Sequence, residues 1–375
     1  MITVANPSKK NNSEDSCIND RHHRKDDHLV ALKPLEVSKC NSFSDLLEAY
    51  KYTAFAARST GEAADILHEM ATDKDCFVVL TLSGAMTIAK MGLVACDMID
   101  NGMVDVVVST GALMAHGFIE SAGMEHYKYN PHMNDEALYQ KGYNRVYDTL
   151  EPESNFDKAY EIFTKVMSNW DTKETASSHT INRMLGEYLH KNAPGRGILK
   201  SAFEQDVPVY IPAFTDSEMG LDFALLRREF RAKGSDINYD PFIDLEDYTA
   251  RILKAKKIGI FTIGGGVPRN WAQQVGPYLD LIKWRLSKKA QEKSNLKISE
   301  TEGSGSGHLK KFNYAVRICP EPTHFGGLSG CTYSEGVSWG KFVPEKEGGR
   351  FAEVYADATL AWPLVVKAVL ERMGK

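Results

Sequence analysis

The run Phe77-Val78-Val79-Leu80, with Thr81-Leu82-Ser83-Gly84-Ala85 behind it, decides the fold prediction. It is short, apolar and rich in β-branched residues, and small residues follow it. Near-continuous apolar character indicates a strand that is buried on both faces, as in a parallel sheet. Comparable runs occupy residues 104–108, 208–211, 258–261, 314–318 and 353–356.

Segments with a helical period separate these apolar runs. The alternation of strand-like and helix-like segments predicts an α/β fold with a doubly wound, mostly parallel sheet. In such a sheet, ligands bind beyond the carboxyl ends of the strands. The helix-like segments span residues 43–57, 61–71, 86–99, 180–190, 247–256 and 360–373.

The ends of the chain differ in character. Residues 1–28 are polar and poor in large apolar side chains, which indicates a disordered or loosely docked arm. The histidines of this arm are interpreted as part of a solvated tail rather than as metal ligands. Residues 29–375 are expected to form one domain, with a surface insertion at 287–311, where Lys, Glu, Ser and Gly dominate.

Composition limits the class of protein. The chain has 375 residues, 43% of them hydrophobic, which suits a globular protein with a full core. With 45 basic and 50 acidic residues the net charge is −5, so we expect no general nucleic-acid binding. No apolar run is long enough to cross a membrane, and the first residues contain no secretory h-region. The six cysteines show no CxxC spacing, so we expect no metal or disulfide and a reduced, cytoplasmic setting.

Small or acidic residues follow five of the apolar runs. Small residues at such turns let backbone N–H groups approach a phosphate, and carboxylates there can bind ribose hydroxyls or an amine. Together they indicate a nucleotide-sized, partly cationic ligand, although each turn alone is also explained by ordinary turn chemistry. A Walker loop and a strand-linked GxGxxG are absent, so a dinucleotide site needs a variant arrangement. The residues are Gly84 with Ala85, Thr110 with Gly111, Asp216, the triple glycine 264–266, and Asp357 with Ala358.

A glycine-rich stretch, 326–341, ends in Ser338-Trp339-Gly340-Lys341. A lysine is a nucleophile only when it is neutral, and partial burial beside an aromatic ring lowers its pKa. A neutral Lys341 could form an imine with a carbonyl compound, and Glu335 could hold an ammonium group or move protons. The alternative is an ordinary surface lysine.

Several of these segments resemble the deoxyhypusine synthase family, and more closely its bacterial deoxyhypusine synthase-like members. The similarity extends over roughly residues 30–375. It is carried most specifically by Glu335-Gly336-Val337-Ser338-Trp339-Gly340-Lys341 and by Val354-Tyr355-Ala356-Asp357-Ala358. Further similar segments are 103–112, 212–216, 134–136 and 144–148.

The resemblance implies an NAD-dependent transferase with a Rossmann-like core. Members of the family oxidise spermidine with NAD, transfer its aminobutyl group through an imine on a lysine, and reduce the product imine with the same NADH. The acceptor is a protein lysine in deoxyhypusine synthase and putrescine in the homospermidine synthases. The resemblance also implies small polyamine substrates and a homotetramer with active sites at subunit interfaces.

The resemblance assigns roles by position. Lys341 matches the imine-forming lysine. The positions that contact NAD are Gly84, Ala85, Thr110, Gly111, Asp216, Asp357 and Ala358. The positions that bind amine are Glu335 and Trp339, with Ser329 and Gly330 in the adjoining loop.

The chain departs from the eukaryotic enzymes at acidic and histidine positions. Ala115-His116 replaces a glutamate pair, Asn270 replaces a histidine, Leu328 replaces an aspartate, and Leu221 replaces a further aspartate beside Asp222. His116 and Asn270 remain candidate substrate-site residues, and His116 is either a proton carrier or a hydrogen-bonded structural histidine.

The lost carboxylates favour a small amine acceptor, as in homospermidine synthase, over a protein lysine. A non-catalytic family member that binds a nucleotide or a partner is a third hypothesis, and the retained Lys341, Glu335 and Trp339 argue against it. A plain NAD dehydrogenase is a fourth, and it gives no reason for the Trp-Gly-Lys segment.

Overall fold

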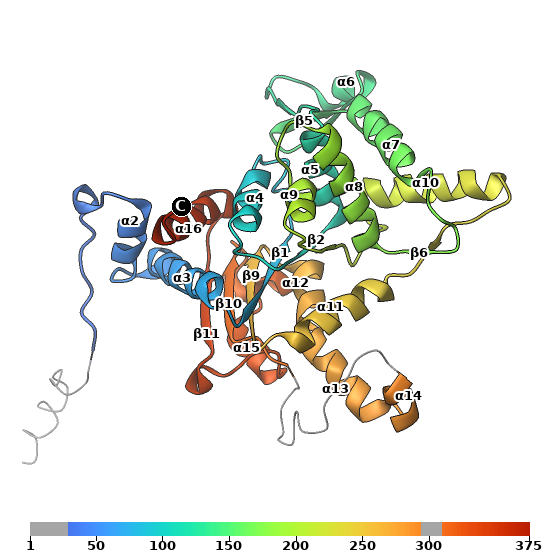
Figure 1. The fold of residues 1–375 in the computed structure, drawn as a ribbon. Helices are drawn as coiled ribbons and strands as arrows, with labels where there is room; N and C mark the ends of the chain where they lie inside the picture. The colour runs from blue at the N-terminus through green and yellow to red at the C-terminus, as the bar shows by residue number, and fades with distance from the viewer. Residues whose placement is uncertain (1–28, 294–309) are drawn as a thin grey trace, which may run out of the picture.

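A six-stranded parallel sheet forms the centre of the molecule (Figure 1). The computed structural model describes residues 29–293 and 310–375. All neighbouring strands of the central sheet are parallel and their order is β11-β10-β9-β1-β2-β7, which confirms the predicted parallel sheet. The strands are β1 (Cys76–Leu82), β2 (Val106–Ser109), β7 (Val209–Tyr210), β9 (Lys257–Ile263), β10 (Tyr314–Ile318) and β11 (Arg350–Val354).

The strand order reverses between β1 and β9. The chain runs outward from β1 through β2 to β7, returns to the other side of β1 as β9, and continues through β10 to β11. This is the strand order of a doubly wound, Rossmann-like sheet, in which the crevice for a ligand lies where the order reverses. The carboxyl ends of β1 and β9 are therefore where this architecture is expected to hold a ligand.

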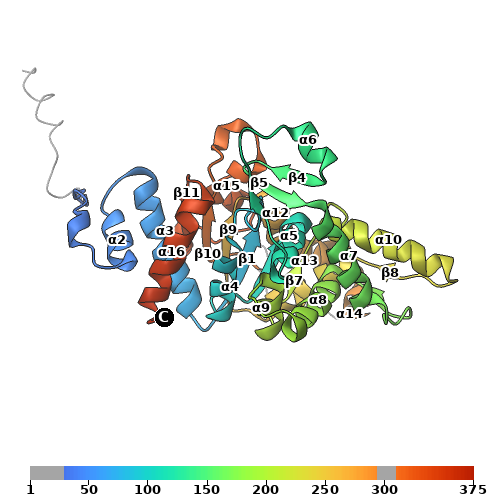
Figure 2. The same cartoon turned by 90° about the horizontal axis from the view of Figure 1, so that it is seen from above.

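The sheet is buried on both faces because alternate residues of each strand point to opposite sides. Val79 and Ile260 belong to one buried cluster, whereas Leu80 and Phe261 belong to another. Helices supply the rest of each cluster, and Figures 1 and 2 show them on both sides of the sheet. The predicted doubly wound architecture is thus confirmed.

The larger cluster packs against most of the helices. They are α2 (Phe43–Tyr50), α3 (Phe55–Thr72), α4 (Gly92–Asp100), α5 (Gly111–Ser121), α7 (Glu153–Met167), α8 (Ser178–Asn192), α9 (Ile198–Glu204), α10 (Glu218–Ala232) and α16 (Ala358–Arg372). The smaller cluster packs against α11 (Phe242–Lys254), α12 (Gly266–Gln273), α13 (Val275–Arg285) and α15 (Tyr333–Ser338).

The fold also contains smaller elements, which the apolar runs of the sequence did not indicate. An antiparallel sheet has the order β3-β5-β4, and β6 pairs with β8 in a short parallel sheet. The bounds are β3 (Tyr127–Lys128), β4 (Tyr143–Val146), β5 (Thr149–Pro152), β6 (Thr175–Ala176), β8 (Asn238–Tyr239), α6 (Asp135–Gln140) and α14 (Lys288–Lys293). The antiparallel sheet becomes important below because β5 carries a buried carboxylate.

The predicted helix at 43–57 is wrong as a single element. Helix α2 ends at Tyr50, and α3 begins at Phe55. The Thr53 hydroxyl donates to the Tyr50 carbonyl at 2.7 Å, and Phe55 has a φ of 59°, which interrupts a right-handed helix. The separately predicted segment 61–71 lies inside α3.

The predicted helix at 86–99 begins too early. Helix α4 starts at Gly92, and residues 84–90 form turns after β1. The Thr87 hydroxyl donates to the Leu113 carbonyl of α5 at 2.8 Å, and Lys90 has a φ of 63°. A side-chain hydrogen bond to a distant helix therefore replaces the expected first turn of α4.

The last predicted strand, 353–356, is displaced. Strand β11 occupies Arg350–Val354 because its register pairs Arg350 with Tyr314, the first residue of β10. The predicted arm, 1–28, and residues 294–309 of the predicted insertion lie outside the described residues, so the proposed domain limits stay a prediction.

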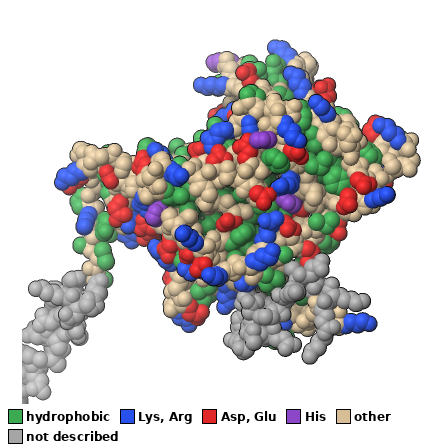
Figure 3. All heavy atoms as spheres, in the orientation of Figure 1, with side chains coloured by type: hydrophobic (Ala, Val, Ile, Leu, Met, Phe, Trp, Pro, Cys, Tyr) green, Lys and Arg blue, Asp and Glu red, His purple; other side chains and the backbone are tan. Residues whose placement is uncertain are grey.

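The surface carries both signs of charge. On the face drawn in Figure 3, acidic and basic side chains alternate with hydrophobic ones, in keeping with the small net charge of −5. Within the ranges that the structure describes, no helix has the length and apolar character needed to span a bilayer.

Gly259 offers a test of the packing between the sheet and α3. A Cβ at this position of β9 would lie 2.3 Å from the Met70 Sδ, and Met70 is buried. We expect Gly259→Ala to lower the free energy of unfolding by about 1–3 kcal/mol, because a filled core resists extra atoms. Thermal and chemical denaturation measure this. Gly195→Ala is the control, because no atom lies within 4 Å of the added Cβ there. Equal stabilities of the two variants would contradict the packing.

Candidate active site

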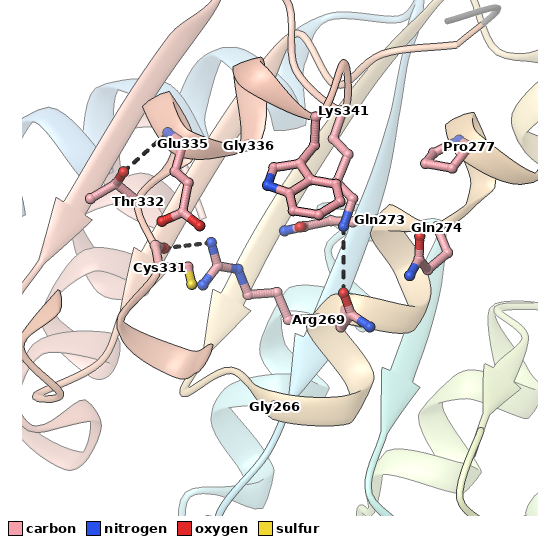
Figure 4. A pocket seen from close by; sticks show the side chains of 12 residues that line it. Gly266, Arg269, Gln273, Gln274, Pro277, Cys331, Thr332, Glu335, Gly336 and Lys341 are labelled. Atoms are coloured by element: carbon pink, nitrogen blue, oxygen red, sulfur yellow. Dashed lines mark hydrogen bonds between the residues drawn. The ribbon is translucent and has the colours of Figure 1, made fainter. Parts of the chain in front are cut away.

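A pocket of about 400 Å³ lies between α12 and the segment 331–341 (Figure 4). The predicted residues Asn270, Glu335, Trp339 and Lys341 all line it. The structure thus brings together four side chains that are up to 71 positions apart in the sequence. Lining residues that the sequence did not indicate are Arg269, Gln273, Gln274, Pro277, Cys331 and Thr332.

Backbone hydrogen bonds fix the position of Lys341. Helix α15 begins at its N-cap Thr332, whose hydroxyl accepts from the Glu335 N–H at 3.1 Å. The helix ends before Gly340, whose φ of 68° turns the chain, and the Lys341 N–H donates to the Gly336 carbonyl. The Lys341 carbonyl in turn accepts from the Phe312 N–H at 2.9 Å.

The Lys341 ammonium group points into the pocket (Figure 4). Its Nζ lies 3.4 Å from the Asn270 Oδ1 and 5.9 Å from the centre of the Trp339 ring. Burial lowers the pKa of Lys341, and the positive charge of Arg269 lowers it further. Among the described residues, no carboxylate lies within ion-pair distance of Nζ, so the lowered pKa is not offset by a salt bridge.

Two buried arginines hold the glycine-rich loop against the pocket. Arg269 donates to the Cys331 carbonyl at 2.7 Å, and Arg317 of β10 donates to the Ser329 carbonyl at 2.9 Å. The Arg317 guanidinium also pairs with Glu353 at 3.3 Å. These bonds satisfy the loop carbonyls, and they keep the positive charge of Arg269 beside Lys341.

The loop also touches the triple glycine. A Cβ on Gly265 would lie 2.7 Å from the Ser329 Cα, so only glycine allows this approach. Ser329 and Gly330 belong to a short 3₁₀ turn, Leu328–Gly330, and Gly330 packs as closely on the Pro322 carbonyl. The predicted loop residues Ser329 and Gly330 therefore lie beside the carboxyl end of β9, and neither is among the described residues that line the pocket.

The turns after β1 and β9 meet where the strand order reverses, which is where a doubly wound sheet places its ligand crevice. Gly84 and Gly264 have φ values of 74° and 75°, and the Ser83 hydroxyl accepts from the Gly265 N–H at 2.8 Å. No atom lies within 4 Å of a Cβ built on Gly266, the first residue of α12. Open backbone at the start of a helix fits the phosphates of a dinucleotide.

The turns after β2 and β7 adjoin this crevice. The Thr110 N–H donates to the Leu82 carbonyl of β1 at 3.3 Å. Gly111 begins α5, and a Cβ there would lie 2.4 Å from Ser217, the N-cap of α10. Asp216 is exposed in the turn just before Ser217. The structure therefore places Gly84, Ala85, Thr110, Gly111 and Asp216 on neighbouring turns.

Asp357 and Ala358 lie apart from that group. They follow β11, the edge strand opposite β7, and the edges are five strand spacings apart, about 24 Å at 4.8 Å each. The Asp357 carboxylate caps α16 by accepting from the Thr359 N–H at 2.8 Å. Asp216 and Asp357 therefore cannot contact the same end of a ligand bound within this chain.

His116 lies outside the pocket. It is on α5, and its Nδ1 is 2.5 Å from a carboxylate oxygen of Glu151 on β5. Asp222 is the neighbour of Leu221, the position at which the eukaryotic enzymes have an aspartate. It lines a small cavity with Ala115 and Glu218. Burial and the Glu218 charge raise the pKa of Asp222 to about 6, whereas the neighbouring Leu221 is exposed.

Sequence reasoning missed the buried charges. A signal was present for Arg317, because it is a charged residue in the middle of the apolar run 314–318. The signal for Arg269 was weaker: it is a charged residue three positions after the triple glycine. Glu151 and its second partner, His126, gave no signal, because their contact depends on the antiparallel sheet.

Comparison with known proteins covers nearly the whole chain. The family model described as deoxyhypusine synthase matches residues 45–369. "Probable deoxyhypusine synthase 2" of Methanosarcina acetivorans is 31% identical over 340 residues, covering 90% of this chain and 89% of that protein. The "Deoxyhypusine synthase-like protein" of Chlorobaculum tepidum is 30% identical over 336 residues, covering 89% of this chain and 87% of that protein.

The fold comparison agrees. The structure titled "Crystal Structure of a putative deoxyhypusine synthase from Entamoeba histolytica" superposes with a TM-score of 0.55 at 15% identity. The superposition covers 90% of this chain and 96% of that one. This likeness shows the fold, whereas the family match over residues 45–369 and the relatives of 30% identity or more show that the chain belongs to the deoxyhypusine synthase family.

Proposed function

We propose that the protein transfers an aminobutyl group from spermidine or a related polyamine, through an imine on Lys341, to a small amine acceptor, with NAD as cofactor. Membership of the family supports a transferase of aminobutyl groups. The observation that carries the lysine assignment is the half-buried Nζ with its lowered pKa, held in a pocket by Asn270. A neutral amine in that position is a nucleophile at moderate pH.

The pocket residues have distinct roles in this proposal. Lys341 Nζ attacks the carbon of the oxidised donor, forms a C=N bond to the aminobutyl group, and releases the remaining diamine. Trp339 offers an aromatic face to a substrate ammonium, and Glu335 offers a carboxylate. Asn270 orients the lysine through its amide oxygen. The acceptor amine then attacks the lysine imine and frees Nζ.

NAD, when bound, supplies the oxidant for the donor amine, and the NADH that results supplies the reductant for the product imine. The residues that we propose to hold it are Gly84, Ala85, Thr110, Gly111 and Asp216, around the crevice between β1 and β9. The backbone N–H groups at the start of α12 would face its phosphates. Asp357 and Ala358, at the far edge of the sheet, are proposed to contact it only through an assembly of several chains.

Charge in the pocket favours a small acceptor. Among the described residues that line it, Glu335 is the one carboxylate, and the Arg269 guanidinium offsets its charge. A lysine-rich protein surface would find little negative charge there, whereas a small diamine acceptor needs less. We therefore propose putrescine as acceptor and homospermidine as product. On family grounds we also propose a cytoplasmic homotetramer with active sites at subunit interfaces.

Incubation with NAD and spermidine, with and without putrescine, tests the activity. Borohydride added during turnover should reduce an aminobutyl imine on Lys341, and mass spectrometry of the peptides should locate it. Product analysis should show homospermidine only when putrescine is present. Transfer to a protein lysine without homospermidine would reassign the acceptor, and absence of any adduct with every polyamine would refute the transfer.

Replacement of the lysine separates chemistry from binding. Lys341→Ala should abolish the trapped adduct and the product, while NAD affinity, measured by calorimetry, stays within about threefold of wild type. The exposed Lys346, five residues further along, gives a matched control, and Lys346→Ala should keep full activity. Loss of NAD binding in a folded Lys341→Ala protein would show that the lysine belongs to the cofactor site.

The lowered pKa of Lys341 predicts a pH dependence. The amine is neutral above its pKa, so trapping should begin at lower pH than for an ordinary lysine, and it should be lost as the pH falls through that pKa. Arg269→Gln removes a positive charge, which should raise the pKa and move the onset of trapping to higher pH. The measurement is adduct yield against pH. An unchanged onset in a variant with native circular dichroism would exclude Arg269 as a cause.

A further inference from the structure

Three side chains of the kinds that bind metals come together where α5 meets the antiparallel sheet. The Nδ1 of His116, the Nε2 of His126 and a carboxylate oxygen of Glu151 all lie within 4.8 Å of one another. His116 is on α5, Glu151 is on β5, and His126 immediately precedes β3. Two imidazole nitrogens and one carboxylate form a ligand set that suits Zn²⁺. The cluster is separate from the lysine pocket, because none of these three residues lines that pocket.

Burial of the cluster protects it from water while leaving one approach. The side chain of Glu151 is 1% exposed and that of His126 is 0% exposed, whereas that of His116 is 13% exposed. The Asn155 amide donates to the Glu151 Oε1 at 3.2 Å and to the Glu125 carbonyl at 3.0 Å, which orients the carboxylate. Zinc sites with three protein ligands normally hold a water as the fourth. The exposed edge of His116 is the side from which that water would enter.

The geometry of the three groups is close to that of a zinc centre. The Glu151 Oε2 lies 2.5 Å from the His116 Nδ1 and 2.9 Å from the His126 Nε2. The two rings are inclined at 64° with 6.1 Å between their centres, so they approach the carboxylate from different directions. Around a tetrahedral Zn²⁺ with bonds of about 2.0–2.2 Å, ligand atoms are about 3.3 Å apart. Both contacts therefore need to widen by less than about 1 Å, which small side-chain rotations provide.

Lys90 competes with a metal ion for His126. Its Nζ lies 2.8 Å from the His126 Nδ1 and 3.2 Å from a carboxylate oxygen of Glu120. A histidine that binds a metal through Nε2 carries its proton on Nδ1 and normally donates it to an acceptor. An ammonium group has donors only, so Lys90 has to turn toward Glu120 when the ion binds. The Lys90 side chain is 44% exposed, which allows that movement.

We propose that His116, His126 and Glu151 bind one Zn²⁺ ion, with water as the fourth ligand, and that Lys90 lowers the affinity of this site. The ion joins α5 to the antiparallel sheet, and it stabilises the folded chain because the unfolded chain cannot assemble the three ligands. The prediction of no metal rested on the spacing of the cysteines. That spacing does not bear on histidines that lie 25 and 35 positions from their carboxylate.

Calorimetric titration of Zn²⁺ into the full chain, after treatment with a chelator, tests the site. The wild-type protein should bind one equivalent. Glu151→Gln should weaken binding by more than about 10²-fold, and Lys90→Met should strengthen it by about tenfold, because it removes the ammonium group beside the ligand ring. His190→Gln is the matched control, because this exposed histidine also pairs with a glutamate, Glu204, at 2.9 Å. Its affinity should equal that of wild type.

His116→Gln provides a second variant in case Glu151→Gln does not fold, since His116 is the least buried of the three ligands. It should also weaken zinc binding by more than about tenfold. Absence of saturable binding to folded wild-type protein, or equal affinity in a folded His116→Gln protein, would overturn the proposal.

Co²⁺ in place of Zn²⁺ reports the kind of ligand. The wild-type protein should give the visible absorption bands of tetrahedral cobalt, and Glu151→Gln should lose them. An intense near-ultraviolet band from thiolate to cobalt would instead place the ion on cysteines and refute the site.

Thermal unfolding tests the structural role of the ion. Saturating Zn²⁺ should raise the Tm of the wild-type protein, and a chelator should reverse the change, because the ion binds the folded chain. Glu151→Gln should show no such rise. Lys341→Ala should bind zinc as tightly as wild type, so this result stands or fails separately from the proposed transfer reaction. An unchanged Tm at saturating zinc would refute the stabilising role.

Discussion

The Ser83 hydroxyl makes the contact on which the architecture of the site depends. It donates to the Ile263 carbonyl at 3.1 Å and accepts from the Gly265 N–H at 2.8 Å, so it joins the turns after β1 and β9. The hydroxyl also occupies the space of a side chain on Gly264, 2.3 Å from the Cβ position. A Cβ on Gly265 would likewise lie 2.7 Å from the Ser329 Cα, so three turns meet at one point. The loop that leads to the lysine pocket is therefore packed directly on backbone at the carboxyl end of β9.

Buried positive charge links the stability of the loop to the reactivity of the lysine. Arg317 is wholly buried and Arg269 nearly so, and removal of charge from water costs several kcal/mol per ion unless partners compensate. Loop carbonyls and Glu353 provide that compensation. The Arg269 charge then acts on Lys341, whose pKa it lowers. A change that loosened the loop would thus also alter the nucleophile.

Sequence alone could predict elements whose signal is local. The strands of the central sheet were predicted because burial on both faces leaves continuous apolar runs, and the residues of 335–341 were found because they form one unusual segment. The start of α4 was predicted wrongly because it depends on a hydrogen bond from Thr87 to a helix 26 residues away.

The sequence did not reveal which distant segments lie side by side in the fold. The order of the strands cannot be read from the runs, so nothing in the sequence separated Asp216 from Asp357, which lie at opposite edges of the sheet. The network around Glu151 likewise joins residues 25 and 35 positions apart, through a small sheet without an apolar signature. A single histidine in the sequence does not reveal which carboxylate will orient it.

The late start of α4 also decides which helix ends lie close to the centre of the sheet. Gly92 lies ten positions after the last residue of β1, whereas α5 and α12 begin within three positions of the ends of β2 and β9. The positive helix ends nearest the crevice are thus those after the second and fourth strands of the sheet. The segment 84–91 therefore carries no helix N-terminus directly after β1. Instead, Thr87 donates a hydrogen bond to α5, and Lys90 contacts His126.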